Sequence, residues 1–408
     1  MEGERKALAD KLLFSKEAAE YLGISVQRLA VLTKEGRIIP IKKNSSGTIY
    51  HIDELEKRKK ELSIFSSAYA GYESKGEEAG MFEINTKTRN EALNLAVAMN
   101  ILHASEKKAC KIIDLLDRRI AYEPMTENFH HWEKILDASH ETIKKEYENA
   151  RLAFNHLHET DEIIRIGDPS YPKLLSQTEE APRFLYLRGR INLLQDIRTV
   201  ALVGSRQAGE EGRKNTERVA RILGSNGIII VSGLAKGIDV TAHKAALDNG
   251  LPTIAVIGTN LNQYYPSENK DVQKRIEQEG LVVSQFSPAT KTERWFFPLR
   301  DGVMSGLSQA TVIMEAGETS GALKQARYAL KQNRLVLIPQ NAFNIPSITW
   351  PEKFERLGAL RVKTPSEIIE ILSEHRVYRT EESHTIRTYD LFDDDNMIVA
   401  DTSGEYRV

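Results

Sequence analysis

A regular alternation of short apolar runs and helical patterns begins at residue 199, and it constrains the fold more than any other feature. Apolar runs of β-branched and aliphatic residues fall at 199–203, 228–231, 253–257, 281–283, 311–314 and 335–338. Patterns with helical periodicity fall between them, at 209–225, 238–249, 268–279, 299–308 and 320–332. Strand and helix repeats of this length are typical of parallel sheets with crossover helices, so the sequence predicts an α/β fold with a doubly wound parallel sheet.

The first two of these runs end in small residues that are followed by one basic side chain and a helix start. The first ends in Gly204, Ser205 and Arg206, and the second continues as Ser232, Gly233, Leu234, Ala235, Lys236 and Gly237. In a parallel sheet both ends lie at the carboxyl edge, where α/β folds place ligands. Glycine lets a ligand approach the backbone, and a helix N-terminus offers unpaired N–H groups. The sequence therefore predicts a phosphate site formed by Gly204, Ser205, Arg206, Ser232, Gly233, Lys236 and Gly237. The spacing matches neither the GxGxxG fingerprint nor the P-loop.

Composition narrows the classes of function. The chain has 408 residues, which predicts two or three domains, and 56 Lys+Arg stand against 58 Asp+Glu, so nucleic-acid binding must be local. A single cysteine, Cys110, excludes an internal disulfide framework and a cysteine-built zinc site, and we expect it simply to be buried. The histidines between 130 and 158 lack ligand spacing, so no metal is expected. No apolar run is long enough for a membrane span, and we expect a cytoplasmic protein.

Changes in composition divide the chain into five segments. We expect a small N-terminal domain at 1–62, a linker at 63–87 that is rich in Ser, Gly, Ala and Glu, and a helical domain at 88–160. The alternating sheet domain follows at 161–375, and an acidic tail at 376–408 is expected to be disordered. The tail holds apolar residues among its acids, so a docking peptide and a solubilising tail both stay open as interpretations.

The N-terminal segment shows a helix, a tight turn, a second helix and a hairpin. Helix Lys16–Leu22 is followed by a helix that Ser25 caps, and then by strands at Ile38–Ile41 and Thr48–Ile52. This layout resembles the winged helix-turn-helix of the excisionase/MerR type. The resemblance implies duplex DNA binding, with major-groove contacts from Ser25, Gln27 and Arg28 and wing contacts from Lys42 and Lys43. The alternative is a small helical domain used for protein contacts.

Longer motifs extend the interpretation of the sheet domain. The segments VALVGSR, VSGLAKGIDVTAH, TIAVIGTNLNQYYPSEN, FPLRDGVMSGLS and VIMEAGETSGALKQA resemble the DNA-processing protein A (DprA/Smf) family. The resemblance implies an extended Rossmann-like fold that binds single-stranded DNA, forms a homodimer and assists a RecA-type recombinase during DNA uptake. It implies neither catalysis nor a cofactor. It also adds Arg300, Ser320 and Gly321 to the expected phosphate contacts.

Two other classes of function stay open. In a nucleotide sensor, the same pocket would hold a small signalling nucleotide; Asp301-Gly302, where the family usually has Asn-Arg, and the unusual N-terminal segment favour it. A nucleotide-hydrolysing enzyme is disfavoured because the PGGxGT loop of nucleotide phosphoribohydrolases is missing. His243 follows Asp239 by four residues, and we expect it to make a structural hydrogen bond rather than a catalytic pair. Tyr264 and Tyr265 either stack on bases or pack under their loop.

Overall fold

The structure is a computed structural model, and it describes residues 12–22, 29, 33, 38–44, 47–53, 55–56, 77–195 and 198–375. The chain divides into two compact units, Met1–Phe82 and Glu83–Val408, each of which is described by itself. The expected acidic tail at 376–408 lies outside the described residues.

The N-terminal unit contains β1 (Leu12–Phe14), α2 (Ser15–Leu22), β2 (Lys42–Asn44) and β3 (Gly47–His51). The strands form an antiparallel sheet in the order β1-β3-β2 around a small core that includes Leu29 and Tyr50. The first helix and a hairpin are as expected, although β2 begins after Ile38–Ile41, where the strand was predicted. Lys42 is exposed on β2, whereas Ser25, Gln27, Arg28 and the Lys43 side chain lie outside the described residues, so the helix-turn-helix prediction is untested.

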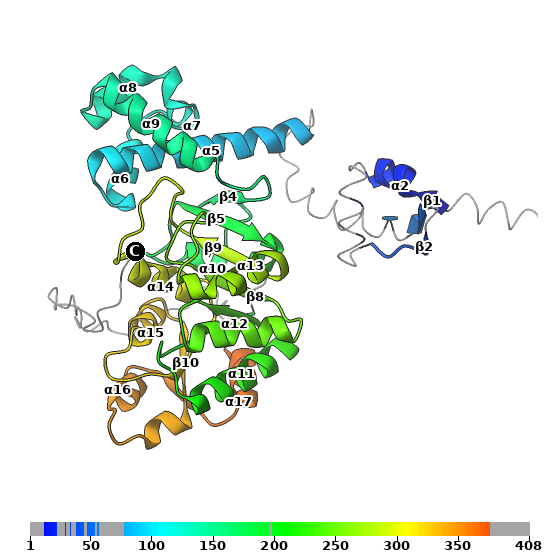
Figure 1. Ribbon diagram of the computed structural model, residues 1–408, viewed down its shortest axis with the longest axis vertical. Helices are drawn as coiled ribbons and strands as arrows, with labels where there is room; N and C mark the ends of the chain where they lie inside the picture. Colours follow the sequence, from blue (N-terminus) through cyan, green and yellow to red (C-terminus); the bar gives the residue numbers. More distant parts are fainter. Residues whose placement is uncertain are drawn as a thin grey trace, which may run out of the picture. The chain divides into compact units, whose positions relative to one another are not determined.

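A helical layer opens the second unit (Figure 1). It contains α5 (Glu77–Leu102), which belongs to this unit from Glu83 onward, α6 (Glu106–Ile113), α7 (Arg118–Tyr122), a short 3-10 turn η1 (Met125–Glu127), α8 (Phe129–Leu136) and α9 (His140–Phe154). Trp132 and Phe154 are fully buried in its core, which continues into the sheet domain through Phe184 and Tyr186 of β5. Helix α5 begins at Glu77, inside the segment 63–87 that composition predicted to be a linker.

The central sheet has nine strands in the order β12-β11-β10-β6-β7-β8-β9-β5-β4. Their bounds are β4 Glu162–Arg165, β5 Phe184–Gly189, β6 Thr199–Gly204, β7 Ile229–Ser232, β8 Thr253–Val256, β9 Leu281–Ser284, β10 Ala310–Glu315, β11 Leu335–Pro339 and β12 Leu360–Val362. All pairs from β12 to β9 are parallel, as predicted, and β5 and β4 add an antiparallel edge. The apolar residues of β6 to β10 are buried on both faces, which explains their continuous apolar runs.

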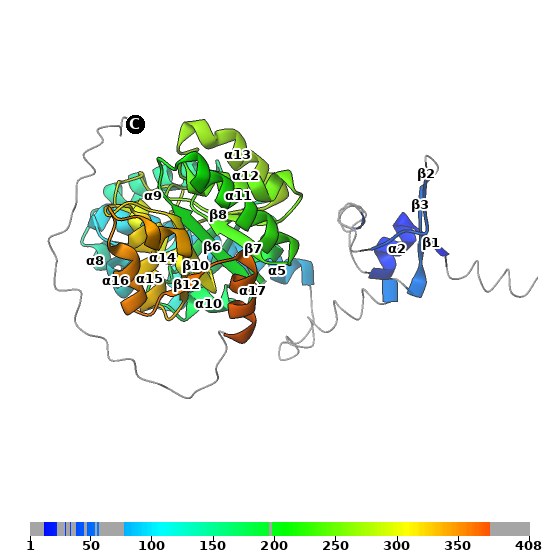
Figure 2. The ribbon, with the colours of Figure 1, turned by 90° about the horizontal axis from the view of Figure 1, so that it is seen from below.

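Helices cover both faces of this sheet, as a doubly wound fold requires (Figure 2). Helices α11, α12 and α17 share one apolar core with the strands, and α14, α15 and α16 share another. The bounds are α10 Lys173–Ser176, α11 Glu210–Ser225, α12 Ile238–Asp248, α13 Lys270–Glu279, α14 Phe296–Gly306, α15 Ala322–Lys331, α16 Trp350–Arg356 and α17 Pro365–Glu374. Short 3-10 turns lie at η2 (Ile191–Gln195), η3 (Ser267–Asn269) and η4 (Gln340–Asn344).

The order of the strands marks where a ligand is expected. From β6 the chain moves outward through β7, β8 and β9, and β10 then returns to the other side of β6. The direction of winding therefore reverses between β6 and β10. In open α/β sheets, ligands bind outside the carboxyl ends of the strands at such a reversal.

Candidate nucleic-acid interface

The loops that follow β6 and β7 meet at the carboxyl edge of the sheet. The Ile238 N–H donates a hydrogen bond to the Ser205 carbonyl oxygen at 3.2 Å. Gly237 has a φ of +74°, and a Cβ at that position would overlap the carbonyl oxygens of Ser205 and Arg206. Only glycine fits such a close approach in this conformation without strain. The two basic, glycine-bearing segments of the sequence are therefore held against each other.

Two of the predicted cations, Arg206 and Lys236, lie exposed on this edge. Lys236 Nζ forms an ion pair with Glu268 at 2.9 Å, and the two side chains are 51% and 50% exposed. Burial raises the pKa of both Asp239 and Asp301, and the positive charge of Arg206 is among those that oppose the rise, after Arg300. We call Arg206 and Lys236 the outer cations. Their exposure leaves both side chains accessible to a ligand that carries phosphate groups.

Arg300 lies deeper than a surface phosphate contact would. Its side chain is 6% exposed, its Nη1 donates to the Val256 carbonyl oxygen at 2.8 Å, and its Nε lies 3.1 Å from Asp301 Oδ1. A Cβ on Gly233 would overlap the guanidinium, so the loop after β7 lies directly over it. The structure thus shows Arg300 bound to groups of the protein itself, beneath the edge where the sequence predicted phosphate.

Two carboxylates complete this buried group. Asp239 is 6% exposed and accepts hydrogen bonds from the N–H groups of Gly233 at 3.2 Å and Ala235 at 3.4 Å. Burial raises the pKa of Asp239, and Arg300 opposes that shift. Burial likewise raises the pKa of Asp301 from its ordinary value of 3.8 to about 6, again opposed by Arg300. We call Asp239, Arg300 and Asp301 the inner charge cluster.

The remaining predicted residues occupy structural positions or the margin of the edge. Ser232 is fully buried, and its hydroxyl donates to the Leu202 carbonyl oxygen at 2.6 Å. A Cβ on Gly204 would lie 2.5 Å from Ile238 Cγ1, so this glycine lets α12 approach the strand. Ser205 is partly exposed and accepts a hydrogen bond from the Gln207 N–H at 3.1 Å. Ser320 and Gly321 lie at the start of α15, after the end of β10, and Gly321 is exposed.

Sequence reasoning missed the role of Glu315 at this site. Glu315 is the last residue of β10, and its carboxylate accepts hydrogen bonds from the Gly209 N–H at the start of α11, at 3.0 and 3.3 Å. Its carbonyl oxygen accepts from the Ser205 N–H at 2.7 Å. The available signal was Gly212, because a glycine in the first turn of a helix indicates that something approaches its backbone closely.

His243 makes a structural hydrogen bond, as expected, but with Thr253 rather than with a group near the loop. Its ring is fully buried, and Nδ1 lies 2.8 Å from Thr253 Oγ1. The Thr253 hydroxyl donates its only hydrogen to the Ile230 carbonyl oxygen, so His243 Nδ1 is the donor. Burial lowers the pKa of His243 to about 3, and the ring is therefore neutral at physiological pH.

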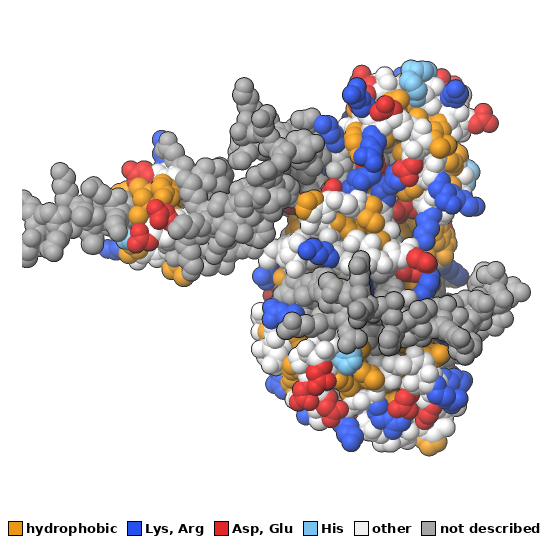
Figure 3. Space-filling view, turned by 180° about the vertical axis from the view of Figure 1, so that it is seen from behind, with side chains coloured by type: hydrophobic (Ala, Val, Ile, Leu, Met, Phe, Trp, Pro, Cys, Tyr) orange, Lys and Arg blue, Asp and Glu red, His pale blue; other side chains and the backbone are white. Residues whose placement is uncertain are grey.

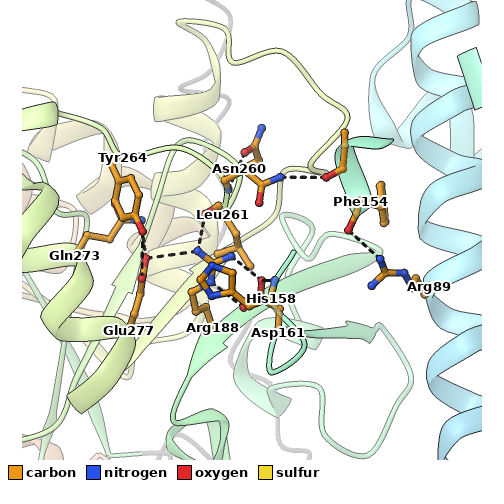
Figure 4. Close-up of polar contacts among 12 residues, drawn as sticks. Arg89, Phe154, His158, Asp161, Arg188, Asn260, Leu261, Tyr264, Gln273 and Glu277 are labelled. Carbon is orange, nitrogen blue, oxygen red and sulfur yellow. Dashed lines mark hydrogen bonds and ion pairs between the residues drawn. The ribbon is translucent and has the colours of Figure 1, made fainter. Parts of the chain in front are cut away.

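The two tyrosines after β8 have different environments. The Tyr264 hydroxyl donates to Glu277 at 3.4 Å (Figure 4). The Tyr264 ring packs under Lys270. Glu277 in turn lies 3.8 Å from Arg188, whose guanidinium binds Asp161 and the Leu261 carbonyl oxygen. This buried network anchors the loop to β5, so Tyr264 is a packing residue. Tyr265 is 36% exposed and contacts the Phe297 ring, with 5.0 Å between the centroids.

Charge on the visible surface is mixed. On the coloured part of the face in Figure 3, lysine and arginine side chains are interspersed with aspartate and glutamate. This distribution agrees with local rather than global recognition of a polyanion.

Within the described ranges no group of His, Cys, Asp and Glu side chains is arranged to hold a metal ion. Of the helices in that part of the chain, none has the length and apolarity needed to cross a membrane.

Comparison with known proteins agrees with this geometry. The family model of DNA recombination-mediator protein A matches residues 162–373, just over half of the chain. Protein Smf from Synechocystis is 36% identical over 226 residues, which cover 54% of this chain and 54% of that protein. DNA processing protein DprA from Streptococcus pneumoniae is 42% identical over 169 residues, which cover 41% of this chain and 59% of that protein. The chain thus matches only somewhat more than half the length of these relatives.

One solved structure supports the same relationship, and a second is reported for its similarity alone. The crystal structure of DprA from Streptococcus pneumoniae has a TM-score of 0.53 at 29% identity and covers 70% of this chain and 95% of its own. Helicobacter pylori DprA, solved for its mode of binding single-stranded DNA, has a TM-score of 0.48 at 28% identity.

Proposed function

Because the chain belongs to the DNA recombination-mediator protein A family, we propose that it binds single-stranded DNA through phosphate contacts at the carboxyl edge of the sheet. The observation that carries the proposal is the meeting of two loops far apart in sequence, each presenting one exposed cation. Arg206 comes from the loop after β6 and Lys236 from the loop after β7. A strand that crosses both loops gives its successive phosphates to both side chains.

The role of the protein is the binding and handling of DNA rather than catalysis. The relatives named above are DNA-processing proteins, which does not favour the nucleotide-sensor interpretation. The carboxylates of the inner charge cluster and the buried His243 are committed to partners inside the protein: Asp239 to backbone N–H groups, Asp301 to Arg300 and His243 to Thr253. Phosphate binding by charged side chains needs no general acid or base.

Three further parts of the proposal follow from the resemblance. We propose a homodimer, assistance to a RecA-type recombinase, and duplex binding by the N-terminal unit, where Lys42 is exposed on the hairpin. A sizing experiment, a pull-down with and without single-stranded DNA, and a gel shift with duplex DNA test these separately. Two DNA contacts on one chain would gain affinity through effective concentration.

The decisive experiment removes both outer cations. We expect Arg206→Ala with Lys236→Ala to abolish the binding of a single-stranded oligonucleotide in a gel shift without unfolding the protein. The matched control is Arg218→Ala with Lys244→Ala, which removes two exposed cations from α11 and α12. Each lost phosphate contact should also reduce the salt dependence of binding, by about 0.7 in the logarithmic slope for a single strand. Equal loss in both double variants would show that net charge, not this site, drives binding.

A further inference from the structure

The helix N-terminus nearest the reversal of winding is occupied by a carboxylate of the protein itself. Helix α11 begins after Gly209, whose N–H donates to Glu315 Oε1 at 3.0 Å and to Oε2 at 3.3 Å. In related sheet folds this helix start is where a nucleotide phosphate accepts backbone hydrogen bonds. Here Glu315 supplies the two oxygens and the negative charge that such a phosphate would supply.

The fit around Glu315 is close. A Cβ on Gly212 would overlap the carboxylate, so the glycine leaves room for this side chain against the first turn of the helix. The Ser205 N–H holds the Glu315 backbone through its carbonyl oxygen at 2.7 Å. Glu210 and Glu211 lie in the same turn, and Glu210 pairs with Lys214 at 2.6 Å. The carboxylates of Glu315 and Glu211 therefore leave the helix start unfavourable for a small anion.

The loop after β7 shows the same arrangement independently. The Gly233 and Ala235 N–H groups converge on one oxygen, Asp239 Oδ2, at 3.2 and 3.4 Å. Neighbouring loop N–H groups that converge in this way form a concavity that suits an anion. The residue they bind is 6% exposed, so this anion position is also filled from within the protein.

We propose that Glu315 and Asp239 are specificity-determining residues that exclude free nucleotides and pyrophosphate from the backbone anion positions of this edge. Ligand phosphates are then held only by side chains, Arg206 and Lys236, from the outside. A small phosphate ligand gains little from exposed side-chain cations alone, whereas a polymer engages both loops at once. The preference for a chain of phosphates rests on the proposed function, but the exclusion of small phosphates does not.

The test uses the full chain with Glu315→Gln and Glu315→Ala. Glu315→Gln keeps the length and one acceptor oxygen while removing the charge, and Glu315→Ala opens the helix start. Glu217→Gln is the matched control, because it removes an exposed carboxylate from the same helix. Pyrophosphate and ADP are titrated by calorimetry, and a single-stranded oligonucleotide is titrated by fluorescence anisotropy. A thermal melt of each variant confirms that it is folded.

We expect both Glu315 variants to bind pyrophosphate at least about tenfold more tightly than the wild type, while Glu217→Gln matches the wild type. Wild-type binding of pyrophosphate as tight as in the variants would overturn the inference, and so would variants that fold but gain no affinity. The oligonucleotide titration reports on the other proposal: a wild type that excludes pyrophosphate yet ignores single-stranded DNA keeps the inference and removes the proposed function.

Discussion

The inner charge cluster and the outer cations occupy the same edge of the sheet but have opposite relations to solvent. Asp239 and Arg300 are 6% and 5% exposed, whereas Lys236 is 51% exposed in its side chain. The inner groups are neutralised by one another and by backbone hydrogen bonds. Asp239 holds the loop that bears Lys236, and the backbone bond from Ile238 to Ser205 joins that loop to the one that bears Arg206.

This difference in exposure assigns the inner charge cluster to positioning the loops and the outer cations to binding the ligand. A buried charge that loses its partner is left without solvation, so removing one member of the inner charge cluster should affect folding first. An exposed cation is solvated in any case, so its removal should affect binding while stability changes little. The four predictions below test that division, and they are ordered by the size of the expected effect.

Arg300→Met should give the largest effect. Methionine fills similar volume but leaves the buried Asp239 and the partly buried Asp301 without their cation, and the free energy of unfolding should fall by about 3–5 kcal/mol. Urea unfolding measures the change, with Arg218→Met as the exposed control on α11. If Arg300→Met were fully stable and defective only in DNA binding, Arg300 would have to be reassigned to the outer group.

Gly237→Ala comes next, because this residue joins the two loops. Its φ is +74°, and an added Cβ would overlap the Ser205 carbonyl oxygen. Gly250→Ala is a close control, since Gly250 has a φ of +66° but no atom within 4 Å of an added Cβ. Both variants carry backbone strain of about 1–3 kcal/mol, and Gly237→Ala should lose further stability and also DNA affinity. Equal losses in the two variants, with DNA binding intact, would show that the contact between the loops does not position the cations.

The fold was predictable because its signal is local. The six apolar runs after residue 199 all became strands of the parallel sheet, since a strand buried on both faces requires a continuous apolar segment. The edge strands of the sheet have weaker apolar patterns in the sequence. Strands β4 and β12 are short and partly exposed, and sequence analysis missed both. Helix α5 begins among glycines and glutamates that composition alone assigned to a linker.

The site was predictable only in part, because burial of charge is a tertiary property. Arg206, Lys236 and Arg300 carry the same sign, and all three were expected to contact phosphate, yet Arg300 lies in α14 with its guanidinium directly beneath Gly233. No local pattern shows that Asp239 and Arg300, which are far apart in sequence, share one buried cluster. Glu315 was equally hidden, because its partner Gly209 lies on a different element.

A change in pH should have a smaller effect on DNA affinity, because it changes the protonation of Asp301. Its folded pKa of about 6 exceeds the ordinary 3.8, so the native protein gains this proton as pH falls through about 6 and the cluster loses one negative charge. Single-stranded DNA should therefore bind more tightly at pH 5.5 than at pH 7.5, by about threefold, since one charge acting through water is worth under about 1 kcal/mol. His243, with a pKa of about 3, stays neutral throughout. Asp301→Asn should remove the Asp301 part of this dependence, and an unchanged pH profile in that variant would contradict it.

Glu268→Gln should give the smallest effect, and it tests whether the outer ion pair is exchangeable. Glu268 holds Lys236 at 2.9 Å, but both side chains are about half exposed, and such pairs contribute at most about 1 kcal/mol to stability. A DNA phosphate competes with Glu268 for Lys236, so neutralising Glu268 should raise the affinity for DNA by about twofold while the unfolding midpoint stays unchanged. Asp248→Asn is the control, because Asp248 pairs with Arg275 at 2.8 Å at the far end of α12. The gain should vanish in the Lys236→Ala background. Persistence of the gain there would mean that Glu268 acts through the general field of the surface rather than through this pair.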